Sequence, residues 1–197
     1  MMAMPQAGFC FLATTKTGST AVEAALGRHA ELLTRRPPRM KHMTARTFDH
    51  LIAPVLDHYG HPRESYELVC VVREPVEWVH SWWRYRSRPE AAGRPNSTAG
   101  VPFEDFARRV ADGEIHLGSW AQFTRTAEGR PPVERIYRYE HLGDAVDWMA
   151  GRLGVPTPEM PRLNVSPTGS DGAIPPQIRR LLEERLAADV SVYESAR

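Results

Sequence analysis

Short runs of consecutive apolar residues alternate along the chain with segments whose apolar residues recur every three or four positions. The first pattern is typical of strands buried on both faces of a sheet, and the second is typical of helices with one buried face. Buried strands are predicted at Phe9–Ala13, Glu67–Val72 and Val133–Tyr139. Because helical segments separate these strands, we expect an α/β fold with a mostly parallel central sheet and helices on both faces.

The helical pattern places amphipathic segments between and after these strands. Helices are predicted from Ala21, over Ala45–Leu56 with an interruption at Pro54, and over Val76–Arg86, Phe103–Asp112, Ala145–Leu153 and Gln177–Tyr193. The short piece Arg39–Met43 is compatible with an edge strand, and Gly118–Thr126 is ambiguous. The Pro/Gly/Ser-rich stretch Pro89–Pro102 is expected to be a mobile loop and is a candidate lid, and Thr157–Pro176 is expected to be irregular. The chain, residues 1–197, fits one domain.

Composition and charge exclude some classes of protein but do not indicate a particular function. The chain is 42% hydrophobic and 25% charged, with a net charge of +1, so nothing indicates nucleic-acid binding or a basic membrane-surface patch. There is no apolar stretch of membrane-spanning length and no signal-peptide pattern, so a cytoplasmic protein is expected. Cys10 and Cys70 fall inside the predicted strands, and no Cys/His cluster has metal-ligand spacing. Reduced core cysteines and no bound metal are therefore expected.

The first predicted strand leads into a turn of small, hydroxyl-bearing residues with one cation. The stretch Gly8–Leu26 reads GFCFLATTKTGSTAVEAAL, so the turn is Thr14–Thr20, and Glu23 lies in the first turn of the predicted helix. The N–H groups and the dipole of a helix start favour an anion, Lys16 adds a full charge, and Gly18 allows close approach of a ligand. The stretch therefore predicts a phosphate- or sulfate-binding loop. An ordinary capped strand-to-helix turn is the alternative.

Two observations refine this interpretation. The loop is not a Walker A motif, because Lys16 precedes Gly18 and no GxxxxGK[ST] pattern occurs in the chain. Of the 25 basic residues 23 are arginine, and the two lysines are Lys16 and Lys41. In a chain so biased towards arginine, a lysine indicates a place that needs a compact, mobile ammonium group.

A second polar turn follows the strongest strand of the chain. Arg73 stands where that strand ends, and Ser81 lies two turns along the next helix. An arginine fork and a hydroxyl in this arrangement can bind one anion, while a salt-bridged Arg–Glu–Pro loop is the alternative. Ligands of parallel sheets bind beyond the carboxyl ends of the strands, where both polar turns are expected.

Together, the two turns resemble a known family, the sulfotransferases that use 3′-phosphoadenosine 5′-phosphosulfate (PAPS). Lys16–Thr20 resembles the family's 5′-phosphosulfate loop, and Arg73 with Ser81 resembles its 3′-phosphate motif. Arg138–Leu142 followed by Leu153–Pro156 is similar to its later strand and helix, so the resemblance covers residues 8 to 156. It implies a P-loop-like fold, PAPS as donor, adenosine 3′,5′-bisphosphate (PAP) as product and no metal. The nucleotide-binding residues that it implies are Thr15, Lys16, Thr17, Gly18, Ser19, Thr20, Arg73 and Ser81.

The chain also departs from the small-molecule members of this family. Thr15 stands where they have a proline, and Ala21 where they commonly have an aromatic residue. Their glycine-rich 3′-phosphate segment has no clear counterpart in Asn164–Gly172. The pattern is therefore closer to carbohydrate-type and bacterial sulfotransferases, and it assigns no residue to adenine.

The resemblance also implies a catalytic base. The family places a His or Glu shortly after the first helix, and His42 matches this position in type and order, with Lys41 beside it. Lys16, Lys41 and His42 are thus the implied catalytic residues. His80, next to Ser81, is the competing base, although it should point away from a helix face that presents Ser81. The alternative for a lone histidine is a surface or capping role.

The expected function is transfer of a sulfuryl group from PAPS to a hydroxyl or amine of a small-molecule or carbohydrate acceptor. His42 would accept the acceptor's proton, Lys16 would stabilise the leaving oxygen, and Lys41 would steady the transferring group or an acidic acceptor. A nucleotide kinase or other NTPase is the alternative on the same architecture, and it requires a Gly-Lys-Ser/Thr order and a metal-holding acid. A non-catalytic nucleotide-binding protein is the third possibility.

The aromatic residues of the helix at 76–86 have two expected roles. Trp78 and Trp82, four positions apart, are expected to pack in the core. Trp83 and Tyr85, on other faces, are candidates for the lining of an acceptor cleft.

Overall fold

The strands of the computed structural model, which describes residues 1–161 and 173–197, form one five-stranded sheet in this part of the chain. Their order is β3-β1-β2-β4-β5. The bounds are β1 Met2–Met4, β2 Phe9–Leu12, β3 Leu32–Leu33, β4 Glu67–Val72 and β5 Arg135–Arg138. Strands β2, β4 and β5 pair in parallel, whereas β1 runs antiparallel to both β2 and β3. The expected α/β fold with a parallel sheet core is confirmed.

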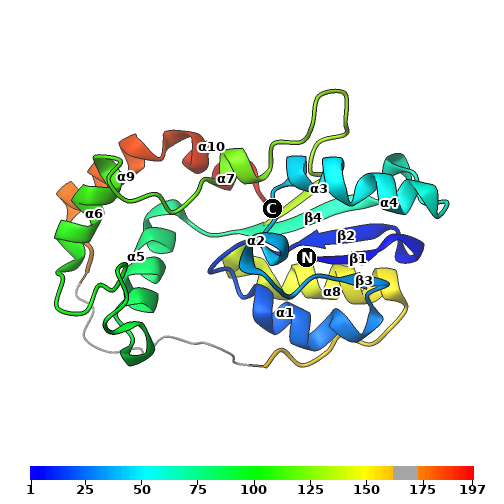
Figure 1. The fold of residues 1–197 in the computed structure, drawn as a ribbon, viewed down its shortest axis with the longest axis horizontal. Helices are drawn as coiled ribbons and strands as arrows, with labels where there is room; N and C mark the ends of the chain where they lie inside the picture. Colours follow the sequence, from blue (N-terminus) through cyan, green and yellow to red (C-terminus); the bar gives the residue numbers. More distant parts are fainter. Residues whose placement is uncertain (162–172) are drawn as a thin grey trace.

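Helices cover both faces of this sheet (Figure 1). Their bounds are α1 Ser19–Leu26, α2 Pro38–Lys41, α3 Ala45–Leu51, α4 Ala53–His58, α5 Pro75–Arg86, α6 Phe103–Ala111, α7 Trp120–Phe123, α8 Leu142–Leu153, α9 Pro176–Arg185 and α10 Ala187–Ser195. Short 3₁₀ turns occur at η1 Pro5–Ala7, η2 Gly27–His29, η3 Arg63–Ser65, η4 Pro89–Ala91 and η5 Tyr139–His141. No helix among these residues is long and apolar enough to cross a membrane.

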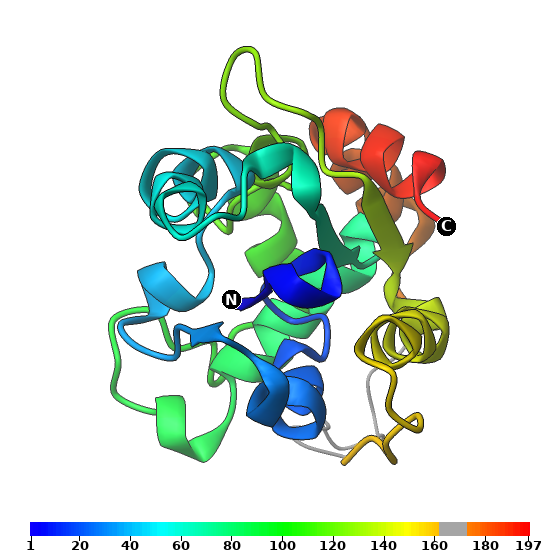
Figure 2. The same cartoon turned by 90° about the vertical axis from the view of Figure 1, so that its right-hand side faces the viewer.

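Alternate residues of the central strands build two separate cores. Cys70 and Val72 of β4 belong to the core beneath α3 and α5, whereas Val69 and Val71 belong to the core beneath α1 and α8. Figure 2 shows the two layers from one end of the sheet, with α3 and α4 in cyan on one side and α8 in yellow on the other. Side chains of a strand point alternately to its two faces, so a continuous apolar run is the pattern that such a doubly covered strand requires.

The strongest local signals are confirmed. Strand β4 has the predicted bounds, and α5 begins at Pro75, one residue before the prediction. The interruption at Pro54 is real, because α3 ends at Leu51 and α4 begins at Ala53. Cys10 and Cys70 are free and fully buried, and burial raises the pKa of both thiols.

Several boundaries differ from the prediction. The piece Arg39–Met43 is not an edge strand, because Pro38 opens helix α2 there; the edge strand is β3. Helix α1 begins two residues early, at Ser19, so Glu23 lies beyond its first turn.

Three more corrections concern the second half of the chain. The predicted C-terminal helix is two helices, α9 and α10, that meet at Leu186. Strand β5 is half-buried rather than buried, because it is the last strand of the sheet. Helix α8 begins at Leu142, three residues before the prediction, and ends at Leu153 with Gly154 as its C-cap, as expected. Within the predicted irregular stretch Thr157–Pro176, residues 162–172 lie outside the described residues.

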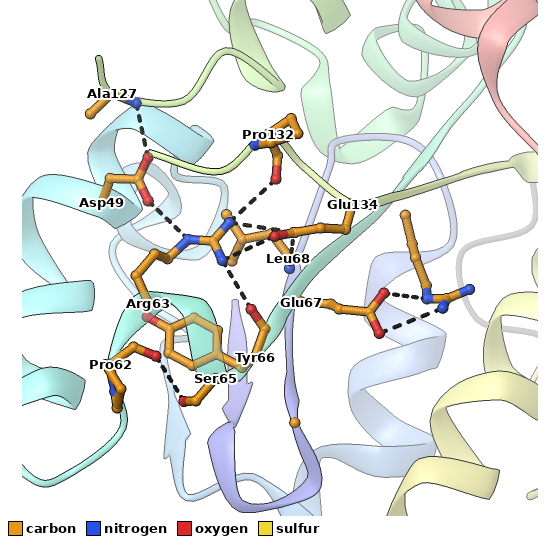
Figure 3. A network of polar contacts seen from close by, with 12 residues as sticks. Asp49, Pro62, Arg63, Ser65, Tyr66, Glu67, Leu68, Ala127, Pro132 and Glu134 are labelled. Atoms are coloured by element: carbon orange, nitrogen blue, oxygen red, sulfur yellow. Dashed lines mark hydrogen bonds and ion pairs between the residues drawn. The ribbon is translucent and has the colours of Figure 1, made fainter. Parts of the chain in front are cut away.

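A buried ion network fixes the edge of the sheet where β4 and β5 begin (Figure 3). The Arg63 guanidinium, with 1% of the residue exposed, donates to Asp49 of α3 at 3.3 Å and to both carboxylate oxygens of Glu134 at 3.2 and 3.3 Å. It also donates to the Tyr66 carbonyl at 2.9 Å, and Glu134 accepts from the Leu68 amide at 2.7 Å. The network therefore joins α3, the start of β4 and the start of β5.

Candidate functional site

The two polar turns predicted from the sequence lie at the same edge of the sheet. The first follows β2 and the second follows β4, and these strands are parallel neighbours, with Leu12 opposite Cys70. The Thr14 hydroxyl donates to the Val71 carbonyl and ties the two strand ends together. The carboxyl ends of β2 and β4 thus present both turns to one region, as expected for a ligand site of a parallel sheet.

Lys16 occupies the first turn in a strained conformation. Its φ of 62° lies in the left-handed region, where residues other than glycine are uncommon and often functional. Its ammonium group lies 4.2 Å from the centroid of the Tyr85 ring, and no described carboxylate forms an ion pair with it. Burial, together with the positive charges of Arg88, Arg73 and Arg84, lowers the pKa of Lys16 from 10.5 to about 8. An electropositive cluster therefore surrounds the first turn.

Arg73 brings the second turn to this cluster. Its guanidinium lies 4.9 Å from the centroid of the Tyr139 ring and 3.9 Å from the Glu77 carboxylate. Its Nε atom is buried and has no acceptor within the described residues. Burial lowers the pKa of Arg73, because desolvation disfavours the charged form. Arg73 thus has unused donor capacity next to Lys16.

Several hydroxyl groups of the first turn form hydrogen bonds within the protein, which the sequence did not predict. Thr17 is fully buried, and its hydroxyl lies 2.7 Å from the Thr14 hydroxyl. The Thr20 hydroxyl accepts from the Lys41 ammonium at 3.3 Å. Ser19 is buried, and Thr15 is half-buried. The main donors that this turn offers to an anion are therefore the Lys16 ammonium and the N–H groups of the first turn of α1.

Gly18 also has a structural reason, in addition to the expected approach of a ligand. It caps α1 with a φ of 74°, a conformation that glycine adopts without steric cost. A Cβ atom at this position would lie 2.8 Å from Leu142 of α8 and 3.5 Å from Tyr139. The close approach at Gly18 is therefore to α8 and the preceding turn.

His42 lies beside the first turn, as its sequence position predicted. Its Nδ1 atom is 2.7 Å from the carbonyl oxygen of Ala13, the residue that follows β2. Burial lowers the pKa of His42, the Ala13 carbonyl opposes this effect, and the charge of Lys41 adds to it. A neutral imidazole is thereby favoured near pH 7.

Lys41 is engaged in a structural contact. Its ammonium group lies 3.0 Å from the Glu23 carboxylate, which also pairs with Arg35 at 2.7 Å. Lys41 therefore links α2 to α1 through a carboxylate that it shares with Arg35. A direct role of Lys41 in transfer stays a prediction, for an ammonium group that is already ion-paired.

Helix α5 carries the other predicted residues. Ser81 is buried on α5, with 5% of its surface exposed. The competing base, His80, packs against Trp83 at 5.4 Å and Phe103 at 4.6 Å between ring centroids, on the side of α6. The Trp83 indole donates to the Val101 carbonyl at 2.8 Å, so its ring is held by the segment that precedes α6.

Two aromatic residues of this edge have contacts that the sequence did not predict. Tyr85, considered for an acceptor cleft, lies under the Lys16 ammonium and is 41% exposed. Trp120 lies in the stretch Gly118–Thr126, which has no clear pattern, and its indole donates to the Arg73 carbonyl at 3.0 Å. No local signal distinguishes such a tryptophan from an ordinary core residue, because the contact joins positions that are far apart in the chain.

The described residues contain no group of three or more His, Cys, Asp or Glu side chains that could hold a metal ion. The segment Asn164–Gly172, compared above with a 3′-phosphate segment, lies outside the described residues. No protein-family model matches this chain, and no curated protein matches it in sequence.

Proposed function

We propose that this protein is a PAPS-dependent sulfotransferase, which transfers a sulfuryl group to a hydroxyl or amine of a small-molecule or carbohydrate acceptor. The observation that carries this proposal is the meeting of Lys16 and Arg73 at the carboxyl ends of β2 and β4. Lys16 carries its charge in a partly desolvated place near Arg73 and has no ion pair among the described residues, which is costly without an anion. A doubly phosphorylated nucleotide would supply negative charge to both turns.

The residues present fit such a ligand. We infer that the turn between β2 and α1 acts as a P-loop-like phosphate-binding loop, in which Lys16 and the first N–H groups of α1 hold the 5′-phosphosulfate. The buried Nε atom of Arg73, which lacks an acceptor among the described residues, is a donor suited to the 3′-phosphate. The buried Ser81 hydroxyl would add a second donor to this phosphate.

His42 has the properties of a base for the acceptor. A carbonyl oxygen can only accept a hydrogen bond, so the contact with Ala13 places the proton of the neutral ring on Nδ1. Nε2 then carries the lone pair that accepts a proton. Because the pKa of His42 is lowered, the ring is ready to act as a base at neutral pH.

The proposed sulfuryl transfer uses His42 and Lys16. His42 Nε2 takes the proton of the acceptor hydroxyl as the acceptor oxygen forms a bond to sulfur. The bond between sulfur and the bridging phosphate oxygen breaks, and this oxygen leaves with the electron pair on PAP. Lys16 stabilises the negative charge that develops on this oxygen, which is the largest electrostatic contribution expected of the protein.

Binding and turnover test this proposal separately. In a thermal-shift assay, PAP should stabilise the protein without added metal, and ATP with Mg²⁺ should stabilise it less. Stabilisation by ATP with Mg²⁺ alone would favour a kinase or NTPase instead. Turnover of PAPS should then be measured over a library of sugar, lipid, peptide and phenolic acceptors. PAP binding without turnover on any acceptor would favour a non-catalytic nucleotide-binding protein.

A further inference from the structure

Two buried tryptophans connect the two polar turns. The Trp78 indole of α5 donates to the carbonyl of Thr15, in the first turn, at 3.1 Å. The Trp120 indole of α7 donates to the carbonyl of Arg73, in the second turn, at 3.0 Å. The two ring centroids are 4.4 Å apart, and the residues are 1% and 2% exposed. Each turn is thus bonded to one member of a packed indole pair.

The C-terminal helices hold Trp120 in place. Asp189 of α10, with 3% of its surface exposed, accepts from the Ser119 hydroxyl at 2.5 Å and from the Ala121 amide at 3.0 Å. These two bonds flank Trp120 in the chain. Figure 1 shows that α7 lies beside α10. The position of Trp120 is therefore set by α10 as well as by its own short helix.

We propose that Trp120 is a positioning residue that, together with Trp78, sets the spacing between the turns of Lys16 and Arg73. This inference rests on the proposed function for its ligand, because only a ligand with two phosphate groups uses both turns at once. A buried N–H group bonded to a backbone carbonyl resists displacement, since breaking the bond leaves both polar groups unsatisfied. A small error in the distance between the two turns would weaken ligand binding and slow the transfer reaction.

The first test compares two ligands in isothermal titration calorimetry. PAP needs both turns, whereas adenosine 5′-monophosphate needs the Lys16 turn alone. Trp120→Phe keeps an aromatic ring but removes the donor to Arg73, so PAP affinity should fall by roughly tenfold. Affinity for the monophosphate should change by less than about twofold. An equal loss for both ligands, or no loss for PAP, would overturn the inference.

Two further variants control for packing and folding. Trp83 lies on the same helix as Trp78, and its indole donates to the Val101 carbonyl at 2.8 Å. Trp83→Phe removes this matched indole donor, and PAP affinity should not change. Trp78→Phe should also lower PAP affinity, and because its indole bonds to Thr15 of the Lys16 turn, affinity for the monophosphate should fall by a smaller factor. It replaces Trp120→Phe if that variant does not fold, and no loss of PAP affinity would then overturn the inference. In the double variant the two losses should be less than additive, because either substitution breaks the same connection.

The second test needs no nucleotide. The chain has two lysines, so protein labelled with ¹³C at lysine Cε gives one signal each for Lys16 and Lys41. Trp120→Phe should raise the pKa of Lys16 above about 8, because Arg73 contributes part of the lowering and is no longer held near it, while the larger effect of burial remains. An unchanged pKa would overturn the inference. If wild-type protein binds no PAP, the proposed nucleotide is wrong, and this measurement alone decides whether the indole pair sets the spacing.

Discussion

The ammonium group of Lys16 lies 4.2 Å from the centroid of the Tyr85 ring, and the guanidinium of Arg88 lies 5.3 Å from the same centroid. An aromatic face attracts a cation without neutralising it. Tyr85 can therefore hold Lys16 among like charges and still leave its positive charge for an anion. A carboxylate in the place of Tyr85 would compete with the phosphates of a nucleotide.

The first prediction concerns the pH dependence of nucleotide binding. The pKa of Lys16 is about 8, against an ordinary value of 10.5, so Lys16 loses its proton as the pH rises through about 8. PAP affinity should therefore fall between pH 7 and pH 9.5, since the phosphates are already ionised throughout this range. Bound PAP should raise the pKa of Lys16, because an anion favours the protonated form. Calorimetry across this range checks the trend, and a constant affinity would contradict it.

The second prediction separates the two lysines. Lys16→Ala should lower kcat by about 10²- to 10³-fold, the loss typical of removing one group that stabilises developing charge. Lys41→Ala should have a smaller effect, because its ammonium is already paired with Glu23 at 3.0 Å. Arg109→Ala, at an exposed position of α6, serves as the control for loss of a surface charge. Equal losses for Lys16→Ala and Lys41→Ala would contradict this assignment.

The third prediction concerns the base. His42→Ala should lower turnover by about 10²- to 10⁴-fold and leave PAP affinity within about twofold of the wild type. Because the pKa of His42 lies below its usual 6.5, turnover should hold at pH 7 and fall only in more acidic solution. The exposed His50 of α3 provides the matched control, His50→Ala. Turnover that survives in His42→Ala would place the base elsewhere.

The fourth prediction tests the tight packing at Gly18. Gly18→Ala introduces a side chain at a φ of 74° and brings its Cβ to 2.8 Å from Leu142, so the free energy of unfolding should fall by about 2–4 kcal/mol. Gly129→Ala has a similar φ of 72°, with no atom within 4 Å of its Cβ. It should therefore cost only the backbone strain, about 1–2 kcal/mol. Urea unfolding measures both, and equal losses would show that α8 yields to the added methyl group.

The fifth prediction concerns the buried ion network. Arg63→Ala leaves Asp49 and Glu134 without their shared partner, so the free energy of unfolding should fall by about 3–5 kcal/mol. Arg109 pairs with Glu114 at 3.0 Å on the surface, and Arg109→Ala should produce almost no change. Because the network lies where β4 and β5 begin, PAP affinity of the folded Arg63→Ala protein should remain close to that of the wild type. A large loss of affinity would show that the two ends of the sheet are coupled.

Local pattern was sufficient for the central part of the fold. The run Glu67–Val72 specified a strand because the five side chains after Glu67 are all apolar, as two covered faces require, and Pro75 specified the start of α5. The same pattern did not reveal β1 or β3, since strands of three and two residues carry too few positions for a periodicity. Arg39–Met43 was assigned wrongly because five residues fit a strand and a helical turn equally well.

The sequence by itself determined which residues follow the carboxyl ends of β2 and β4, and so which cations could meet there. Only the tertiary structure decided that Lys41 is paired with Glu23, that Tyr85 lies beneath Lys16, and that Trp120 bonds to the backbone of Arg73. The physical reason is the range of the interactions. Strand and helix signals arise between neighbours in the chain, whereas each of these contacts joins groups that become neighbours only when the sheet and its two helical layers assemble.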